Sequence, residues 1–258
     1  MTNLVNLDYN FTLLLLIFMR MSGCVLFNPI LGRRNLPVPV RVGLSLMLAV
    51  FTYPLVPQQS LRITSVLAMA FACMKELLVG FVVGFVIEMF LSVIVMGGEQ
   101  IDMQVGISMS RIYDPQSNLA MPLSASVINA MVLMIFFASN SHLTLIRIFV
   151  RLGAAVPYGD RLLSANVFGN LVSMFSLMLM YAAQLALPMI AVQMIVQVGV
   201  GLMMRAVPQI DIFTIEIQLR LIMGFVTILV LVPPLSDFIQ KLISLMFQAI
   251  SRVYSLMV

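Results

Sequence analysis

The longest uncharged run in the sequence places the strongest constraint on the fold. Residues 162–204 carry no charged side chain over 43 positions. As one helix rising 1.5 Å per residue, this run would measure about 65 Å, roughly twice the hydrocarbon thickness of a bilayer. It is too long for a single crossing, so we expect it to fold back or to kink. Pro188 is the position that most favours a break.

The composition indicates the same class of protein. Hydrophobic residues make up 62% of the chain and charged residues 9%, whereas soluble domains carry about 25% charged residues. With 14 basic and 10 acidic side chains, a soluble fold could not cover its own surface. The net charge of +4 comes from scattered arginines rather than a basic run, which argues against nucleic acid as a partner. We therefore predict an all-α integral membrane protein.

Six or seven apolar helical segments can be delimited along the chain. Their approximate bounds are 11–31, 42–56, 65–96, 122–150, 162–204 and 221–232, followed by an amphipathic tail over 235–258. A basic, proline-rich loop follows the first segment, and Pro233-Pro234 is expected to end the sixth. The first ten residues contain no Lys or Arg, so we expect the first segment to remain in the mature protein rather than act as a secretory signal.

Basic residues do not mark one side of a membrane. If the segments simply alternate across a bilayer, the Lys and Arg residues divide six to seven between the two sides, without the usual cytoplasmic excess. One account is that some segments pack against protein partners as well as membrane lipid. Such packing would also supply polar neighbours to Arg20, Glu76 and Glu88, which lie within apolar segments and are expected to make buried polar contacts.

A long polar stretch interrupts the apolar pattern at residues 97–122. It reads G-G-E-Q-I-D-M-Q-V-G-I-S-M-S-R-I-Y-D-P-Q-S-N-L-A-M-P. Glu99, Asp102, Arg111 and Asp114 stand here between two segments that could each enter a bilayer. Ionisable groups are costly in such surroundings, so the stretch is expected to serve a function.

Catalytic motifs are missing from the sequence. His142 is the only histidine, and no H-E-x-x-H, G-x-S-x-G, P-loop or Cys/His cluster occurs. Cys24 and Cys73 lie inside apolar segments and are expected to act as small hydrophobic residues. We predict a protein that is not an enzyme and that holds no metal or cofactor. Two classes stay open: a component of a larger membrane machine, and an ion-coupled secondary transporter that uses Glu88.

Two motifs resemble the FliR family of flagellar biosynthetic proteins. They are G-E-Q-I-D-M-Q-V-G-I-S-M-S-R-I-Y-D-P-Q-S-N at residues 98–118 and G-L-M-M-R-A-V-P-Q-I-D-I-F at 201–213. The chain length, the basic proline-rich loop and the order of apolar segments are also similar to this family. The family includes the equivalent component of injectisome type III secretion systems, and the first motif favours the flagellar branch.

The resemblance implies a structural part of a protein export gate in bacterial flagellum biogenesis. FliR-type proteins assemble with FliP and FliQ into a portal for unfolded flagellar subunits, with FlhB and FlhA as neighbours. This places the chain in the bacterial inner membrane, at the flagellar basal body. The implied fold is a set of kinked or hairpin-forming helices, packed into a hetero-oligomeric helical assembly rather than an ordinary transmembrane bundle.

The resemblance also implies a division of the chain, as one export-gate domain over 1–258. It comprises a first half over 1–96, a plug-like loop over 97–121 that helps close the pore, and a second half over 122–258. Gly106 permits tight backbone geometry, and Asp114 with Pro115 fixes a turn. The alternative is a structural turn between two hairpins. The residues assigned to the loop are Gln104, Gly106, Ser108, Met109, Ser110, Arg111, Asp114, Pro115 and Asn118.

The second motif and the methionines complete the predicted sites. Arg205, Pro208 and Gln209 form an expected assembly motif, in which Pro208 breaks a helix and Arg205 satisfies freed carbonyls or an acidic partner group. Ordinary helix packing is the alternative. The chain has 23 methionines, whose flexible thioethers conform to varied shapes, and those expected to line the pore are Met103, Met109 and Met121.

Overall fold

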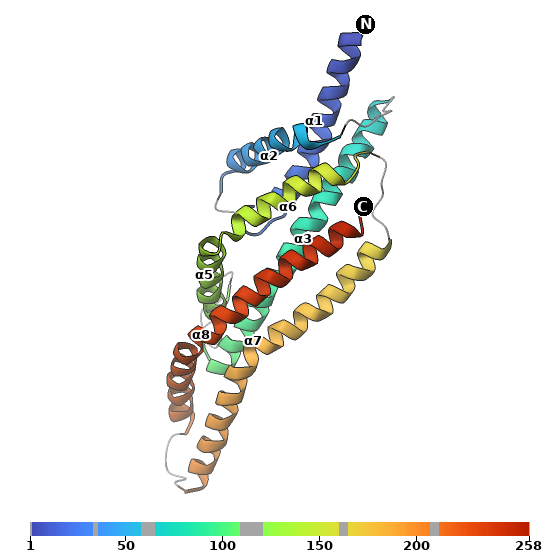
Figure 1. Ribbon diagram of the computed structural model, residues 1–258. Coiled ribbons are helices and arrows are strands. Elements are labelled where there is room, and N and C mark those ends of the chain that lie inside the picture. Colours follow the sequence, from blue (N-terminus) through green and yellow to red (C-terminus); the bar gives the residue numbers. More distant parts are fainter. Residues whose placement is uncertain are drawn as a thin grey trace. The chain divides into compact units, whose positions relative to one another are not determined.

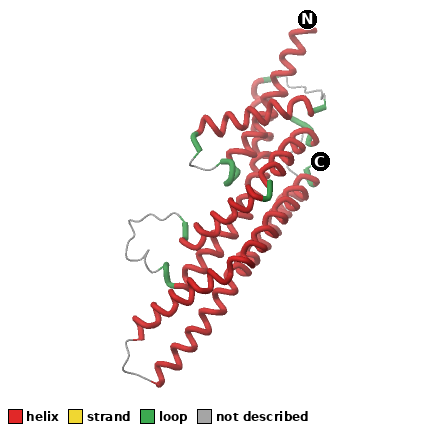
Figure 2. The backbone as a smooth tube through the Cα atoms, turned by 60° about the vertical axis from the view of Figure 1, so that its left-hand side comes forward, coloured by secondary structure: helices red, strands yellow, loops and turns green. Residues whose placement is uncertain are grey.

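The computed structural model describes residues 2–32, 36–57, 65–108, 121–159, 165–206 and 212–257. Every regular element in these ranges is helical (Figures 1 and 2), so the predicted all-α class is confirmed. The elements are α1 (Thr2–Leu26), α2 (Val38–Thr52), the 3-10 turn η1 (Tyr53–Leu55), α3 (Val66–Val105), α5 (Leu123–Ala138), α6 (Ser141–Ala155), α7 (Ala165–Ala206) and α8 (Ile212–Ser255).

Within the part of the chain that the structure describes, four stretches are long and apolar enough to cross a membrane. They are Val38–Leu55, Val66–Val105, Asn166–Arg205 and Ile215–Ser255, and α5 with residues 141–151 of α6 is long and apolar enough as a pair, with a bend of 73° between the two helices. Within the most apolar stretch of α7, 28% of the residues are buried by the rest of the chain, and the corresponding share for α8 is 11%. The apolar surface left exposed on these helices requires lipid or protein around it. The prediction of an integral membrane protein is therefore confirmed.

Three long helices, α3, α7 and α8, continue through positions where the sequence analysis expects a break or an end. The uncharged run was expected to fold back or to kink at Pro188; it does not fold back, because it is one continuous helix, α7, with Pro188 inside it. In the same way, α8 continues through Pro233 and Pro234. Because a helix satisfies its own backbone groups, apolar surroundings favour its continuation through a proline, which removes only one donor.

The third long helix corrects the assignment of the polar stretch. α3 ends at Val105 rather than near Met96, so the stretch that begins at Gly97 starts as helix. Glu and Gln have good helix propensity, and polar side chains do not by themselves end a helix. The first nine residues of the predicted plug-like loop therefore belong to α3.

One predicted segment is instead divided in two. Residues 122–150 were expected to form a single helix, but α5 ends at Ala138 and α6 begins at Ser141. Asn140 between them has a φ of 55°. Asn is one of the few residues that tolerates this left-handed conformation, which ends a right-handed helix.

Contacts divide the chain into two compact units. Unit 1 comprises residues 1–89, 140–174 and 244–258, and unit 2 comprises residues 90–139 and 175–243. α3, α7 and α8 each contribute residues to both units. The functional division at residues 97–121 stays a prediction.

Glycines bring α1 and α3 into backbone contact within unit 1. A Cβ atom added to Gly80 would lie 2.9 Å from the Cα of Gly23, and one added to Gly84 would lie 2.9 Å from the backbone of Phe27. Glycine at these positions lets the two helix backbones approach closely. This contact fixes the part of α3 that carries Glu76 against the part of α1 that carries Arg20.

Candidate functional site

A buried aspartate in the last turn of α3 caps the start of α5. Asp102 is 1% exposed. Its carboxylate accepts hydrogen bonds from the backbone N–H groups of Leu123 (2.7 Å) and Ser124 (3.0 Å), and the Ser124 hydroxyl donates to the same carboxylate. The N-cap residue of α5 is Pro122, whose side chain cannot accept a hydrogen bond. Asp102 therefore supplies the cap, and its charge faces the positive end of the α5 dipole.

The main chain of Asp102 also holds the end of its own helix. Its carbonyl oxygen accepts hydrogen bonds from the N–H groups of Gly106 (3.0 Å) and Ser108 (3.4 Å). Gly106 has a φ of 90°, so α3 ends in the left-handed cap that glycine favours. Asp102 is thus bonded on both sides of the connection over residues 109–120. We call Asp102, with Gly106, Ser108, Leu123 and Ser124, the Asp102 joint.

Three glycines allow other helices of unit 2 to approach α3 near this joint. A Cβ at Gly98 would lie 2.5 Å from the backbone nitrogen of Ala125, and one at Gly97 would lie 2.5 Å from a methyl group of Leu185. A Cβ at Gly224 of α8 would lie 2.7 Å from Val105. The two glycines that open the polar stretch therefore serve close helix packing rather than a loop.

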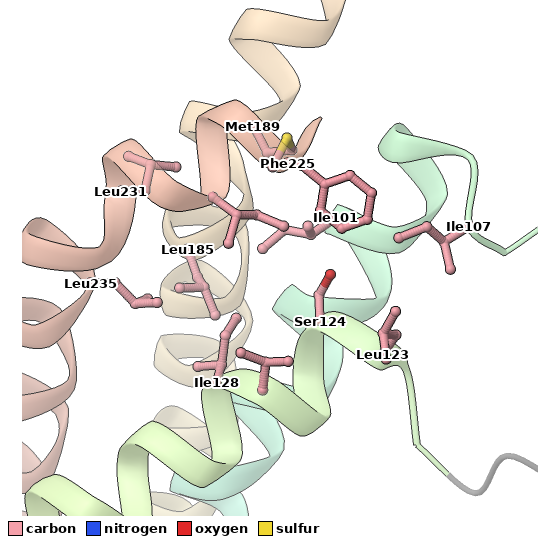
Figure 3. Close-up of a pocket in the computed structure, with 12 residues that line it drawn as sticks. Ile101, Ile107, Leu123, Ser124, Ile128, Leu185, Met189, Phe225, Leu231 and Leu235 are labelled. Carbon is pink, nitrogen blue, oxygen red and sulfur yellow. The ribbon is translucent and has the colours of Figure 1, made fainter. Parts of the chain in front are cut away.

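An apolar cavity of about 230 Å³ adjoins the joint in unit 2. Figure 3 shows that side chains of α3, α5, α7 and α8 point into it. Ser124 provides the polar side chain of the lining, and its hydroxyl already donates to Asp102. A cavity with this lining can accommodate an apolar group, but it presents no set of polar side chains for catalysis. The lining residues are Ile101, Ile107, Leu123, Ser124, Val127, Ile128, Leu185, Met189, Phe225, Ile228, Leu231 and Leu235.

Unit 1 contains a buried ion pair. Arg20 and Glu76 are 0% and 3% exposed, and the Arg20 Nε donates to Glu76 Oε2 at 2.7 Å. Both residues were expected to make buried polar contacts, and here they lie against each other. The partners lie in this chain, so no second protein is needed to satisfy them.

The same pair holds the segment that follows α6. Arg20 donates from Nη1 to the carbonyl of Val156 (2.8 Å) and from Nη2 to that of Pro157 (3.2 Å). The Arg20 guanidinium lies over the ring of Tyr158, 3.7 Å from its centre, and burial raises the pKa of this phenol. The N–H of Gly159 donates to Glu76 Oε1 at 2.9 Å. Two charged side chains therefore fix four consecutive residues against α1 and α3.

Comparison with known proteins places the chain in a family. Residues 11–246 match the family described as bacterial export proteins, family 1. The chain belongs to this family. It is 30% identical over 237 residues to the flagellar biosynthetic protein FliR of Escherichia coli K12, covering 92% of this chain and 90% of the relative.

Two further relatives of the export-protein family show its breadth. The flagellar biosynthetic protein FliR of Bacillus subtilis 168 is 27% identical over 255 residues, which cover 95% of this chain and 96% of the relative. The Yop proteins translocation protein T of Yersinia pestis is 23% identical over 208 residues, which cover 80% of each chain. The resemblance found from the two motifs is thus confirmed.

The structure places only some of the residues predicted for this export protein. Gln104, Ser108 and Met121 are half-buried, and Met103 is 53% exposed. Arg205 is exposed in the last turn of α7. The others lie outside the described residues, namely Met109, Ser110, Arg111, Asp114, Pro115, Asn118, Pro208 and Gln209.

Glu88 departs from its prediction. It is exposed in this chain, because it lies on a face of α3 that the other helices leave uncovered, and so it makes no buried contact here. The cysteines are free thiols, Cys24 buried and Cys73 half-buried. Among the described residues, no group of three or more His, Cys, Asp or Glu side chains is placed to hold a metal ion.

Asp102 and Ser124 were not among the predicted site residues. One signal in the sequence could have found them. An acidic residue in the last turn of a helix faces the negative end of the helix dipole, so Asp102 requires a compensating partner. The start of α5, Pro-Leu-Ser, lacks a capping residue at the proline and requires an acceptor from elsewhere.

Proposed function

We propose that this export-family protein is a structural component of the flagellar type III protein export gate. In this role it forms, with FliP and FliQ, the entry portal for unfolded flagellar subunits in the bacterial inner membrane, near FlhB and FlhA at the basal body. The family match over residues 11–246 and the flagellar names of several relatives support this assignment. The role requires no catalytic residues.

The observation that supports an assembled, structural role most strongly is the exposed apolar surface of α7 and α8. Ile195 on α7 is 72% exposed, and Leu229 and Val230 on α8 are 72% and 69% exposed. Apolar surface of this extent is covered by lipid or by other proteins in a stable state. In the proposed complex, FliP and FliQ cover part of it.

We also propose that the polar stretch closes the pore as a plug-like loop. The Asp102 joint supports this role, because it bonds Gly106 and Ser108 on one side of the 109–120 connection and Leu123 and Ser124 on the other. Met103 and Met121 flank the same connection and supply flexible thioethers around a passing chain. Arg205, Pro208 and Gln209 take part in assembly with the partner proteins.

Copurification and export together test the assembled role. In cells that lack their own copy, we expect the intact chain to be recovered with FliP and FliQ and to restore export of flagellar subunits. Arg205→Ala and Pro208→Ala should lower the yield of the complex, whereas Arg147→Ala, on an exposed face of α6, should leave it unchanged. A chain that is stable alone and is never recovered with FliP or FliQ would contradict the proposal.

Two alternative functions can be distinguished from the export gate with the same cells and the same purified chain. The relative from Yersinia pestis favours the injectisome equivalent as a second candidate, which predicts restored export of injectisome substrates instead of flagellar subunits. An ion-coupled secondary transporter predicts solute movement by the purified chain in liposomes, with loss of transport in Glu88→Gln. Glu88 is exposed in this chain rather than buried among the helices, which does not favour the transporter.

A further inference from the structure

We propose that Asp102 is a positioning residue that sets the separation between the end of α3 and the start of α5. Its carboxylate fixes the first turn of α5, and its carbonyl fixes the residues that follow α3. The relevance of this separation to export rests on the function proposed above. The geometry of the joint is a property of the described residues and can be tested independently of it.

The position of Asp102 is unfavourable for its own helix. It lies four residues before Gly106, in the last turn of α3, where the helix dipole repels a negative charge. At the start of α5 the same charge is favourable, because two N–H groups and the positive end of a second dipole meet it. The carboxylate is therefore stabilised only while the start of α5 is held against the end of α3.

The surroundings of the joint strengthen this coupling. Asp102 is almost fully buried, and its neighbours Ile101 and Leu123 line the apolar cavity (Figure 3). Hydrogen bonds are electrostatically stronger in such a medium, and a carboxylate that loses its donors there is costly. If α5 moved away from α3, the Asp102 carboxylate would lose its hydrogen-bond donors while still buried, which is unfavourable. At a solvent-exposed cap, water could replace the lost hydrogen bonds, so such a cap would hold the two helices together less firmly.

A backbone contact one turn earlier fixes the same face of α3. Gly98 and Asp102 are spaced i, i+4, so they lie on one side of the helix. Gly98 contacts the backbone of Ala125, and Asp102 bonds the preceding residue, Ser124. The packing at Gly98 sets how closely α5 approaches, while Asp102 sets where its first turn lies along α3.

Distance measurement between spin labels on the two helices tests this role in the full chain reconstituted in a membrane. Labels at Gln100 on α3 and Ala130 on α5 occupy exposed positions, in a background with Cys73→Ala. We expect a narrow distance distribution in the parent chain and loss of that narrow distribution in Asp102→Ala. Asp102→Asn keeps one acceptor and should give an intermediate result. Ser124→Ala keeps both backbone bonds and should remain narrow.

A matched control is provided by Glu99, an exposed acidic residue of the same helix. Glu99→Ala should leave the distribution narrow, since it removes an equal charge without touching the joint. An unchanged distribution in Asp102→Ala would overturn the proposal, and so would equal broadening in Glu99→Ala. If Asp102→Ala broadens the distribution while cells stay sealed to ions, the positioning role stands, and the link between this separation and closure of the pore is contradicted.

Discussion

At the scale of single residues, Arg20 and Glu76 show how an apolar fold can hold two ionisable groups. Arg20 bonds Glu76 and two backbone carbonyls, and Glu76 in turn accepts from Gly159. Pairing and hydrogen bonding of this kind are what offset the desolvation of buried charges. The pair serves to hold the 156–159 segment in place, in addition to any contribution to stability.

A first prediction concerns the loss of one partner of this pair. Glu76→Gln leaves Arg20 charged and buried, and removal of one partner of a buried pair typically costs about 3–5 kcal/mol. We expect a large fall in the thermal unfolding midpoint of the detergent-solubilised complex, with a similar fall in Arg20→Gln. In the double variant, the unfolding midpoint should fall by less than the sum of the falls in the two single variants, because the two side chains stabilise each other. Arg147→Gln is the surface control, and a fall of equal size there would contradict this account.

A second prediction follows from Tyr158, which is 3% exposed and whose pKa burial raises from 10.0. In the unfolded chain the phenol ionises from about pH 10, whereas in the folded chain it keeps its proton to higher pH. Unfolding therefore releases a proton, and the stability contributed by this group falls as pH rises above about 10. Below that pH the group adds no dependence on pH.

The comparison of Tyr158→Phe with the parent chain isolates this effect. Phenylalanine keeps a ring over Arg20 but cannot ionise, so the unfolding midpoint of the variant should fall less steeply between about pH 9 and pH 11. Parallel curves over this range would show that the phenol is not protected from ionisation in the folded state.

At the scale of helices, contacts between backbones decide how α1 and α3 pack. Gly23 and Gly80 meet at a point where neither helix can accommodate a side chain. Gly43 of α2, in the same unit, offers a contrast, because nothing lies within 4 Å of an added Cβ. The same substitution therefore has opposite consequences at the two positions.

The third prediction uses this contrast. Gly80→Ala places a methyl group against the backbone of α1 and should lower the yield and the unfolding midpoint of the protein, since overpacking typically costs about 1–3 kcal/mol. Gly43→Ala should be neutral or stabilise by up to about 1 kcal/mol, because alanine favours a helix over glycine. Equal tolerance of both substitutions, measured by thermal unfolding in detergent, would contradict the backbone contact.

Helix type could be predicted from the sequence, but helix ends and contacts could not. Apolar runs without charge indicate helices in a membrane, and that part of the fold is confirmed. Pro188 and Pro233 do not end their helices, because a proline removes only one backbone donor, whereas Asn140 separates α5 from α6 because its left-handed φ cannot continue a right-handed helix. The bond from Asp102 to Ser124 joins residues 22 positions apart, and no periodic pattern reports such a contact.

At the scale of the whole molecule, the helices leave much apolar surface uncovered and pair their most deeply buried charges internally. Arg20 and Glu76 find partners inside the chain, while the apolar faces of α7 and α8 lie open. A protein that pairs these two buried charges inside the chain and exposes apolar faces is suited to assembly in a membrane. Family membership makes an export apparatus the assembly to test first.

The measurement that tests the central claim most directly is ion leakage across the membrane of cells that express the chain with FliP and FliQ. The intact chain is compared with a variant that lacks residues 108–118, and recovery of the complex is checked in both. We predict that the shortened chain still assembles and that its cells leak protons and small ions while cells with the intact chain stay sealed. A complex that forms with the shortened chain and remains sealed would contradict the claim that the polar stretch closes an export pore.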